Sequence, residues 1–269
     1  MTDTPPLTQL SQDDRGVATI TLNRPQVHNA FNAALITQLH QDIVRLDEDE
    51  SVRVLVLTGE GRSFSAGADL NGMKEIAQVD EQSNMADALA LADMLRRLAY
   101  TKTPTVARVN GAAYGGGVGL IACCDVAIGS DDARFGLTET RLGLVPAVIS
   151  PYVINALGAR QANRLFLTAR IFAAHDAERL GLLHRSVPAA ELDAAVNEEI
   201  DLLMKAGPQA LFAAKSLVGA VSGRTEDSQK ALDQATAKLI ASLRVSPEGR
   251  EGITAFLEKR AASWVPPKS

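Results

Sequence analysis

Cysteine is scarce in this sequence. Only Cys123 and Cys124 occur among the 269 residues, and they are adjacent within an apolar segment. Neighbouring residues at the start of a helix are poorly placed to bridge each other, so we expect inert core cysteines in a reduced setting. The N-terminus lacks the basic start and apolar stretch of a signal peptide, and no apolar run is long enough to span a membrane. These absences predict a soluble, cytoplasmic protein with no membrane contact.

An excess of positive charge is also missing. Lysine and arginine number 27 against 32 acidic residues, so the net charge is −5. Without a local run of basic residues, neither a nucleic acid nor an anionic membrane is an expected partner. The few histidines show no metal-ligand spacing, so we expect no metal site; they are His28, His40, His175 and His184.

Several common glycine and nucleophile motifs are absent. A dinucleotide fingerprint that starts at Gly115 fails because its sixth position is Leu120, and no Walker loop is present. The segment from Gly61 to Ser65 fails as a nucleophile elbow at its last position. Phosphate cradles and hydrolase triads are therefore disfavoured.

An apolar fraction of 46% is enough for a real core, and the length favours one core domain, residues 1–200, with an appended helical segment, residues 201–269. We interpret residues 1–16 as a frayed segment that leads into the first strand, and residues 71–82 as a candidate mobile lid. The periodicity predicts strands at 17–22, 52–58, 105–109, 125–128 and 182–187. It predicts helices at 31–46 (capped by Asn32), 86–98, 149–157, 159–168, 176–181, 189–205, 208–220, 226–243 and 246–260. Strands that alternate with helices, followed by helices alone, indicate an α/β fold.

The most distinctive stretch runs from Asn110 to Leu120 and contains Gly115, Gly116 and Gly117 between a predicted strand and a predicted helix start. Glycines let another group approach the backbone closely, and the first N–H groups of a helix favour negative charge. A predicted loop at 59–70, which ends in the segment 65–70, follows another predicted strand. Each loop could offer one backbone N–H to a shared carbonyl oxygen, which is how a two-donor oxyanion hole is built. For an isolated glycine triplet, close packing alone is the simpler interpretation.

The residues in these loops resemble the crotonase, or enoyl-CoA hydratase/isomerase, superfamily. The resemblance spans essentially the whole chain, and it is carried by the segments 65–70, 110–117, 135–139, Arg24-Pro25, 29–32 and 256–260. It implies a spiral of ββα units whose helical C-terminal segment forms trimers, often paired as hexamers. It also implies acyl-CoA thioester substrates, with coenzyme A as part of the substrate and no separate cofactor.

Carried over by position, the resemblance makes Ala68 and Gly116 the oxyanion donors and Glu139 a catalytic carboxylate. Two-glutamate hydratases of the family carry their other carboxylate at the position of Gly119, so this chain departs from that pattern. From the residues alone, Glu139 could equally be an ordinary acid in a first helical turn. The further substrate-binding positions that the resemblance implies are Arg24, Ala66, Ala68, Asp69, Leu70, Tyr114, Gly116, Gly119, Phe256 and Lys259.

Simpler interpretations stand beside these roles. Arg24 is placed near the CoA phosphates, and Lys259 with Phe256 near the nucleotide end in a neighbouring subunit, but surface charge is the usual role of Lys and Arg. Asp69 is interpreted as a loop residue that hydrogen-bonds nearby backbone. Tyr114 packs either on the acyl chain or in the core.

The resemblance favours a hydratase that adds water to a 2-enoyl-CoA. A single carboxylate at Glu139 also suits a 3-enoyl-CoA to 2-enoyl-CoA isomerase, and a CoA-binding scaffold without activity is the alternative outside enzymes. The segments 123–125 and 144–153 resemble a bacterial subgroup that hydrates branched glutaconyl-CoA substrates in leucine and terpenoid breakdown. In that reading, the substrate's own carboxylate or a backbone-held water compensates for Gly119.

Overall fold

The main sheet of this protein has six strands, in the order β1-β2-β3-β5-β7-β10. The computed structural model describes residues 5–76 and 78–267. The strands and their bounds are β1 Thr8–Gln12, β2 Val17–Leu22, β3 Val54–Gly59, β5 Thr105–Val109, β7 Val126–Ser130 and β10 Arg185–Val187. β1 pairs antiparallel with β2, and the other neighbours pair in parallel. All six residues of β3 are buried, as expected for a central strand covered on both faces.

A second sheet of four short strands positions the candidate site. Its order is β4-β6-β8-β9, with β4 Ser63–Ser65, β6 Ala112–Tyr114, β8 Arg134–Gly136 and β9 Ile171–Ala173. The first three are parallel, and β9 is antiparallel to β8. The chain thus sends β3 and β4, then β5 and β6, then β7 and β8 to the two sheets in turn, with helical segments after each pair. This repeat is the predicted spiral of ββα units.

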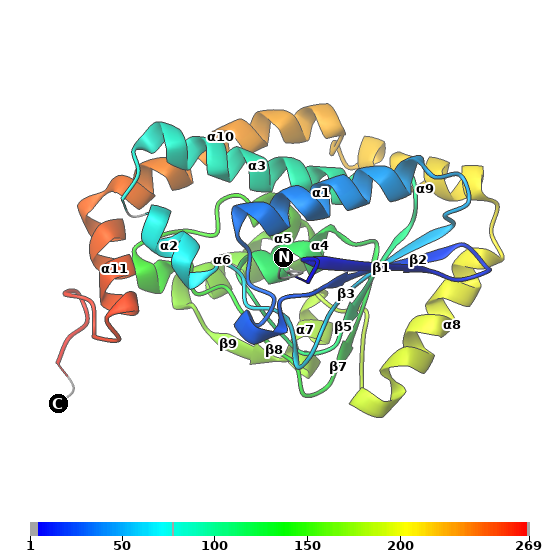
Figure 1. Cartoon of the computed structure of the whole chain (residues 1–269), viewed down its shortest axis with the longest axis horizontal. Helices are drawn as coiled ribbons and strands as arrows, with labels where there is room; N and C mark the ends of the chain where they lie inside the picture. Colours follow the sequence, from blue (N-terminus) through cyan, green and yellow to red (C-terminus); the bar gives the residue numbers. More distant parts are fainter. Residues whose placement is uncertain (1–4, 77, 268–269) are drawn as a thin grey trace.

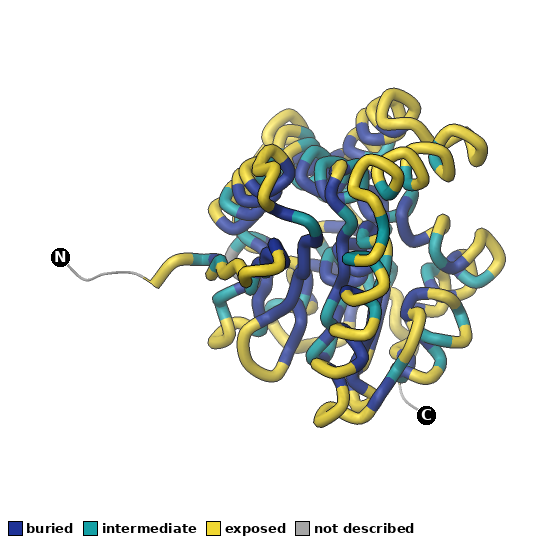
Figure 2. Tube along the Cα trace, turned by 90° about the vertical axis from the view of Figure 1, so that its right-hand side faces the viewer, coloured by how far each residue is buried: buried dark blue, intermediate teal, exposed yellow. Residues whose placement is uncertain are grey.

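Helices cover both faces of the main sheet (Figure 1). α1 (Ala33–Glu48), α3 (Glu81–Ala99) and α10 (Glu226–Val245) lie side by side on one face, and α8 (Leu192–Met204) lies on the other. Asn32 caps α1, because its side chain accepts a hydrogen bond from the Leu35 N–H. Figure 2 shows the buried strands enclosed by helices whose outer turns are exposed.

The remaining helical elements connect the strands and form the C-terminal segment. They are η1 Pro25–Val27, α2 Leu70–Ile76, α4 Gly116–Cys123, η2 Glu139–Leu142, α5 Ser150–Leu157, α6 Ala159–Thr168, α7 Ala174–Leu180, η3 Ala189–Glu191, α9 Pro208–Val221 and α11 Pro247–Leu257. α10 is fastened to α3 by a buried ion pair, in which Arg96 Nη1 lies 2.5 Å from Asp233 Oδ2. Within the described residues, no helix is both long enough and apolar enough to cross a membrane.

The structure corrects several sequence predictions. Residues 8–12 of the expected lead-in form β1, an edge strand in which Leu10 is the one apolar residue, so that no apolar alternation is visible. The expected lid at 71–82 contains most of α2 and the start of α3, and residue 77 lies outside the described residues. The expected loop at 59–70 contains β4, and the last strand begins at 185 rather than 182. The predicted boundary at residue 200 falls inside α8, and the division into two segments stays a prediction.

Candidate active site

The glycine stretch forms a sharp turn into helix α4. Gly115 is the N-cap residue, with φ +49° and ψ −115°, a conformation that residues with a Cβ rarely adopt. Gly116 is the first helical residue, so its N–H has no partner within the helix. The predicted donor therefore lies at the positive end of a buried helix.

The second predicted donor, Ala68, lies on the loop that follows β4. Gly67 adopts φ +81°, and a Cβ built on it would lie 2.6 Å from the Tyr114 carbonyl oxygen and 3.4 Å from the Gly116 nitrogen. The two loops therefore touch, and only glycine at position 67 permits this approach. Ala68 follows Gly67 at this junction and is exposed.

Glu139 reaches the same junction from the third strand of the small sheet. It is the first residue of η2, shortly after β8 ends at Gly136. A Cβ built on Gly115 would lie 3.0 Å from Glu139 Oε1, so the carboxylate lies directly beside the turn into α4. The strands β4, β6 and β8 are parallel neighbours, and their carboxyl ends meet at one edge of the sheet. That edge brings the three segments together. The sequence predicted instead that the loops with Ala68 and Gly116 follow the strands 52–58 and 105–109.

The environment of Glu139 changes its acidity. Its Oε2 atom is buried and has no hydrogen-bond partner within the described residues. Burial raises the pKa of this carboxyl from 4.5 to about 7, and a hydrogen bond from its own backbone opposes the rise. A carboxyl group with this pKa exchanges protons readily near neutral pH, as a general acid and base requires.

Gly119 lies one helical turn along α4 from Gly115, and the Gly119 N–H donates to the Gly115 carbonyl. A Cβ built on it would lie 2.4 Å from Ile149 Cγ2 and 2.9 Å from Ile149 Cβ. Glycine inside a helix is less favourable than alanine by about 1 kcal/mol, so close packing with Ile149 gives a physical reason for its presence here. At the position where the resemblance would put a second carboxylate, the space beside Gly119 holds the Ile149 side chain. Sequence reasoning missed Ile149, although an unexplained glycine inside a helix was a signal for it.

Arg24 and Asp69 form a buried ion pair at 2.8 Å, with side chains 13% and 5% exposed. Asp69 therefore binds a guanidinium, and the predicted hydrogen bonds from nearby backbone to its side chain stay a prediction. The guanidinium of Arg24 already binds Asp69, and phosphate binding by Arg24 stays a prediction.

The other two predicted residues of this loop are Ala66 and Leu70. Ala66 is half-buried, and its N–H donates to the His28 carbonyl. Leu70 begins α2, but its side chain lies outside the described part of the structure.

Among the other predicted substrate-binding residues, Tyr114 lies at the oxyanion junction, whereas Phe256 and Lys259 lie at the surface. Tyr114 is half-buried, with its ring close enough to Gly136 that a Cβ there would lie 2.9 Å from Tyr114 Cδ1. Phe256 is 48% exposed at the end of α11, and Lys259 follows it with φ +55°. α11 itself packs on η2 of its own chain, since a Cβ on Gly252 would lie 2.2 Å from the Leu142 carbonyl oxygen. A role for Phe256 and Lys259 in a neighbouring subunit stays a prediction.

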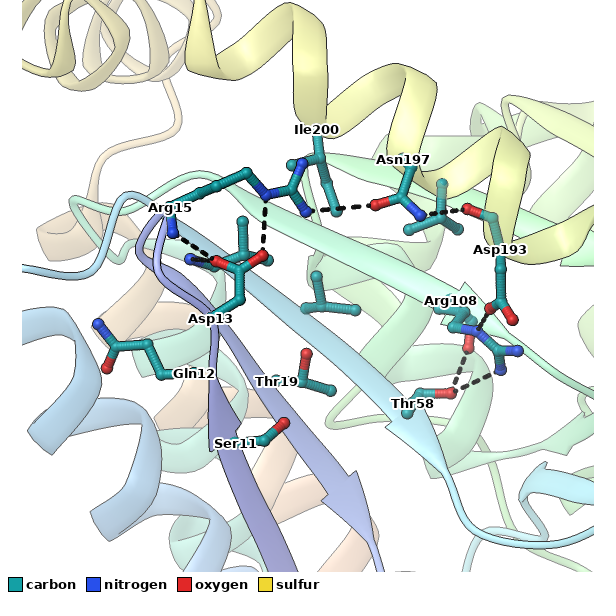
Figure 3. A pocket seen from close by; sticks show the side chains of 13 residues that line it. Ser11, Gln12, Asp13, Arg15, Thr19, Thr58, Arg108, Asp193, Asn197 and Ile200 are labelled. Atoms are coloured by element: carbon teal, nitrogen blue, oxygen red, sulfur yellow. Dashed lines mark hydrogen bonds and ion pairs between the residues drawn. The ribbon is translucent and has the colours of Figure 1, made fainter.

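A separate groove of about 480 Å³ lies between α8 and the β1–β2 hairpin (Figure 3). Its charged side chains pair within its own walls: Arg15 Nε lies 2.8 Å from Asp13 Oδ2, and Arg108 Nε lies 2.6 Å from Asp193 Oδ1. Among the described residues that line this groove, none is a predicted catalytic or substrate-binding residue. The groove is therefore not part of the candidate active site.

Metal ligation has no support within residues 5–76 and 78–267, where no cluster of three or more His, Cys, Asp or Glu side chains could hold an ion. Both cysteines are unpaired, and burial raises the pKa of the Cys124 thiol to about 12. A thiol with so high a pKa is a poor nucleophile, as expected for a core residue.

Comparison with known proteins agrees with this arrangement. The profile of the enoyl-CoA hydratase/isomerase family matches residues 12–266. The crystal structure of an enoyl-CoA hydratase from Shewanella pealeana is similar, with a TM-score of 0.78 and 41% identity, and the match covers 96% of each chain. The 2,3-dehydroadipyl-CoA hydratase of Escherichia coli is 33% identical, over 92% of this chain and 94% of the relative. The crotonyl-CoA hydratase of Syntrophomonas wolfei is 30% identical, over 94% and 96%.

The chain belongs to the enoyl-CoA hydratase/isomerase family. This confirms the resemblance seen in the sequence, and the structural match confirms the predicted crotonase-like α/β fold.

Proposed function

We propose that this protein is an enoyl-CoA hydratase, in which Ala68 and Gly116 bind the thioester oxygen and Glu139 transfers the protons. The observation that carries this proposal is the position of Glu139, whose desolvated carboxyl lies beside the turn that presents the Gly116 N–H. A scaffold without activity would have no need for a carboxyl whose Oε2 atom is buried without a hydrogen-bond partner among the described residues. The names of the relatives from Escherichia coli and Syntrophomonas wolfei support the same reaction class.

The proposed reaction is redox-neutral and needs no cofactor beyond the coenzyme A of the substrate. The ionised Glu139 accepts a proton from a water molecule while the water oxygen bonds to C3 of the 2-enoyl thioester. The π electrons move toward the carbonyl oxygen, where the N–H groups of Ala68 and Gly116 stabilise the negative charge. The protonated Glu139 then donates its proton to C2, which regenerates the carboxylate and completes the addition of water.

A 3-enoyl-CoA to 2-enoyl-CoA isomerase is the second candidate. The packing of Ile149 against Gly119 favours it, because an apolar residue stands where a two-carboxylate hydratase would hold its second group. Isomerisation needs only one group that removes a proton from C2 and returns it to C4, a task that Glu139 could perform alone.

The substrate class we propose is a branched enoyl-CoA of the glutaconyl type. Its own carboxylate, or a water held by backbone groups, would supply the polar contact that Ile149 does not. The Escherichia coli relative is named for a 2,3-dehydroadipyl-CoA, a dicarboxylic acyl chain, which is consistent with an acid-bearing substrate. The Syntrophomonas wolfei relative is named for crotonyl-CoA, which has no second acid group.

We further propose that the protein acts in the cytoplasm as a homotrimer, alone or paired into a hexamer. The support is the apolar surface of α9, where none of the residues is buried and Leu217, Val218 and Val221 are 62%, 69% and 81% exposed. Exposed aliphatic residues at this density typically mark an interface. In such an assembly, Phe256 and Lys259 could bind the nucleotide end of a CoA in a neighbouring subunit.

A panel of CoA esters tests these assignments. The purified protein is incubated with crotonyl-CoA, 3-methylglutaconyl-CoA and a 3-enoyl-CoA, and the absorbance of the conjugated thioester is followed. Loss of absorbance with the first two esters supports hydration, whereas a gain with the third and no loss with the others supports isomerisation. Equal rates on crotonyl-CoA and 3-methylglutaconyl-CoA would contradict the proposed role of the substrate carboxylate.

A further inference from the structure

The buried pair of Arg24 and Asp69 lies immediately beside one of the two proposed oxyanion donors. Arg24 Nη2 is 2.8 Å from Asp69 Oδ2, and Arg24 Nη1 donates to the Ala30 carbonyl at 2.5 Å. One guanidinium therefore holds both the residue after Ala68 and the residue before Phe31. Burying two charges carries a desolvation cost, and one reason to retain such a pair is that it fixes a geometry.

The segment that Arg24 holds is hydrogen-bonded to the donor loop. The Phe31 N–H donates to the Gly67 carbonyl at 2.6 Å, and the Asp69 N–H donates to the Phe31 carbonyl at 2.9 Å. These two bonds make a parallel bridge between Phe31 and Ala68. In a parallel bridge of this pattern, the N–H of the bridged residue points away from its partner. The Ala68 N–H is thus directed away from Phe31 and is not used by this bridge.

The same segment also contacts the other donor. A Cβ built on Gly116 would lie 2.6 Å from Phe31 Cε2, so the Phe31 ring packs directly on the Gly116 backbone. Phe31 therefore connects the two donors, through its backbone to Ala68 and through its ring to Gly116. The buried Asn29 side chain accepts a hydrogen bond from the backbone N–H of Arg24 and donates one to the Ser63 carbonyl. These bonds join this segment to β4.

We propose that Arg24 and Asp69 are positioning residues that set the distance and direction between the Ala68 and Gly116 N–H groups. This assignment rests on the proposed function and gives Arg24 a role other than binding the CoA phosphates. The two roles predict different kinetics. A phosphate contact acts on KM and weakens with salt, whereas correct placement of an oxyanion donor acts on kcat, because the negative charge develops only during the reaction.

The test compares four variants with the wild type: Asp69→Asn, Arg24→Gln, Arg24→Lys and Asp47→Asn. Asp47 is the matched control, because it is a buried carboxylate paired with Arg97 at 3.3 Å and has no contact with the donor loops in the described structure. We expect Asp69→Asn and Arg24→Gln to lower kcat about tenfold to hundredfold while KM changes less than about threefold, as for donors moved by a fraction of an ångström. Arg24→Lys should recover part of kcat, and Asp47→Asn should leave it within about twofold.

A second readout does not depend on turnover. Butyryl-CoA with a labelled thioester carbonyl is saturated and cannot be hydrated, so its infrared carbonyl band reports only how strongly the bound oxygen is polarised. The wild type should lower this frequency, and Asp69→Asn and Arg24→Gln should lower it less at similar affinity. This result would support the inference even if no enoyl-CoA were hydrated and the proposed function failed.

Three results would overturn the inference. If the carbonyl frequency of bound butyryl-CoA in Asp69→Asn and Arg24→Gln equals that in the wild type, the pair does not position the donors. A higher, salt-dependent KM with unchanged kcat in Arg24→Gln would make Arg24 a phosphate-binding residue. An equal loss of kcat in Asp47→Asn would reduce the effect to general destabilisation.

Discussion

The raised pKa of Glu139 implies that this carboxyl destabilises the folded protein when it is ionised. The perturbation that tests this is Glu139→Gln, which keeps the size and shape of the side chain but cannot ionise. The Oε2 atom is buried and has no hydrogen-bond partner in residues 5–76 and 78–267, so ionisation in the folded state places a negative charge in a poorly solvated position.

The magnitude follows from the pKa. Burial raises it from 4.5 to about 7. At about 1.4 kcal/mol for each pH unit of this interval, the two protonation states differ by roughly 3 kcal/mol. The folded state binds the proton more tightly than the unfolded state, so this contribution to stability is fully present below pH 4.5 and is lost as the pH rises through about 7.

Denaturant unfolding of the wild type and Glu139→Gln at one protein concentration measures the effect. The two proteins should differ by less than about 1 kcal/mol in free energy of unfolding at pH 5, and Glu139→Gln should be more stable by about 3 kcal/mol at pH 8.5. Glu251→Gln serves as a control of opposite sign. Hydrogen bonds from Arg260 and Ser263 lower the pKa of Glu251 to about 2. Removal of this carboxylate by Glu251→Gln should therefore lower the free energy of unfolding above pH 4.5.

A difference between wild type and Glu139→Gln that stays constant from pH 5 to pH 8.5 would refute the reasoning. It would show that Glu139 is solvated in the folded protein and titrates near its ordinary pKa. The proposed acid–base role at neutral pH would then lose its physical basis.

Three further predictions concern the same site. Gly119→Ala should lower the free energy of unfolding by about 1–3 kcal/mol, measured by denaturant, because its methyl group would overlap Ile149; the matched variant Gly72→Ala, whose nearest neighbour is 4.0 Å away, should not be destabilised. The kcat/KM for hydration should rise with pH through about 7, as Glu139 ionises to act as a base, and a profile flat from pH 5 to 9 would contradict this. Lys259→Glu should raise KM for CoA esters at low salt, and an unchanged KM would remove Lys259 from the site.

Much of the main sheet follows from the sequence because its strands carry a strong signal. Residues 105–109 and 17–22 have the bounds that their apolar patterns predict, and the cap at Asn32 is formed as expected. The lead-in was wrong at β1 because an edge strand with polar residues has no apolar period. The three-residue strands of the small sheet are too short for any period to be visible.

The candidate site was predictable only where its residues carry a motif. Ala68, Gly116 and Glu139 lie far apart in the sequence, and the structure brings their loops together through the order of the short strands β4, β6 and β8. The pairing of Arg24 with Asp69, and of Gly119 with Ile149, depends on packing between distant segments. No local sequence pattern predicts such contacts. From the sequence alone, Arg24 was therefore predicted to lie near the CoA phosphates, and Gly119 was noted only as the position where a carboxylate is absent.

The most direct test of the central claim, that Glu139 alone transfers the protons of hydration, is the rate at which Glu139→Gln consumes an enoyl-CoA. The wild type and the variant are compared at pH 8 by loss of the conjugated thioester absorbance, with butyryl-CoA affinity measured in parallel. We expect a decrease in kcat of about 10²–10⁴-fold, with affinity nearly unchanged and the same oligomeric state. Undiminished hydration by a folded Glu139→Gln protein would show that Glu139 does not transfer these protons.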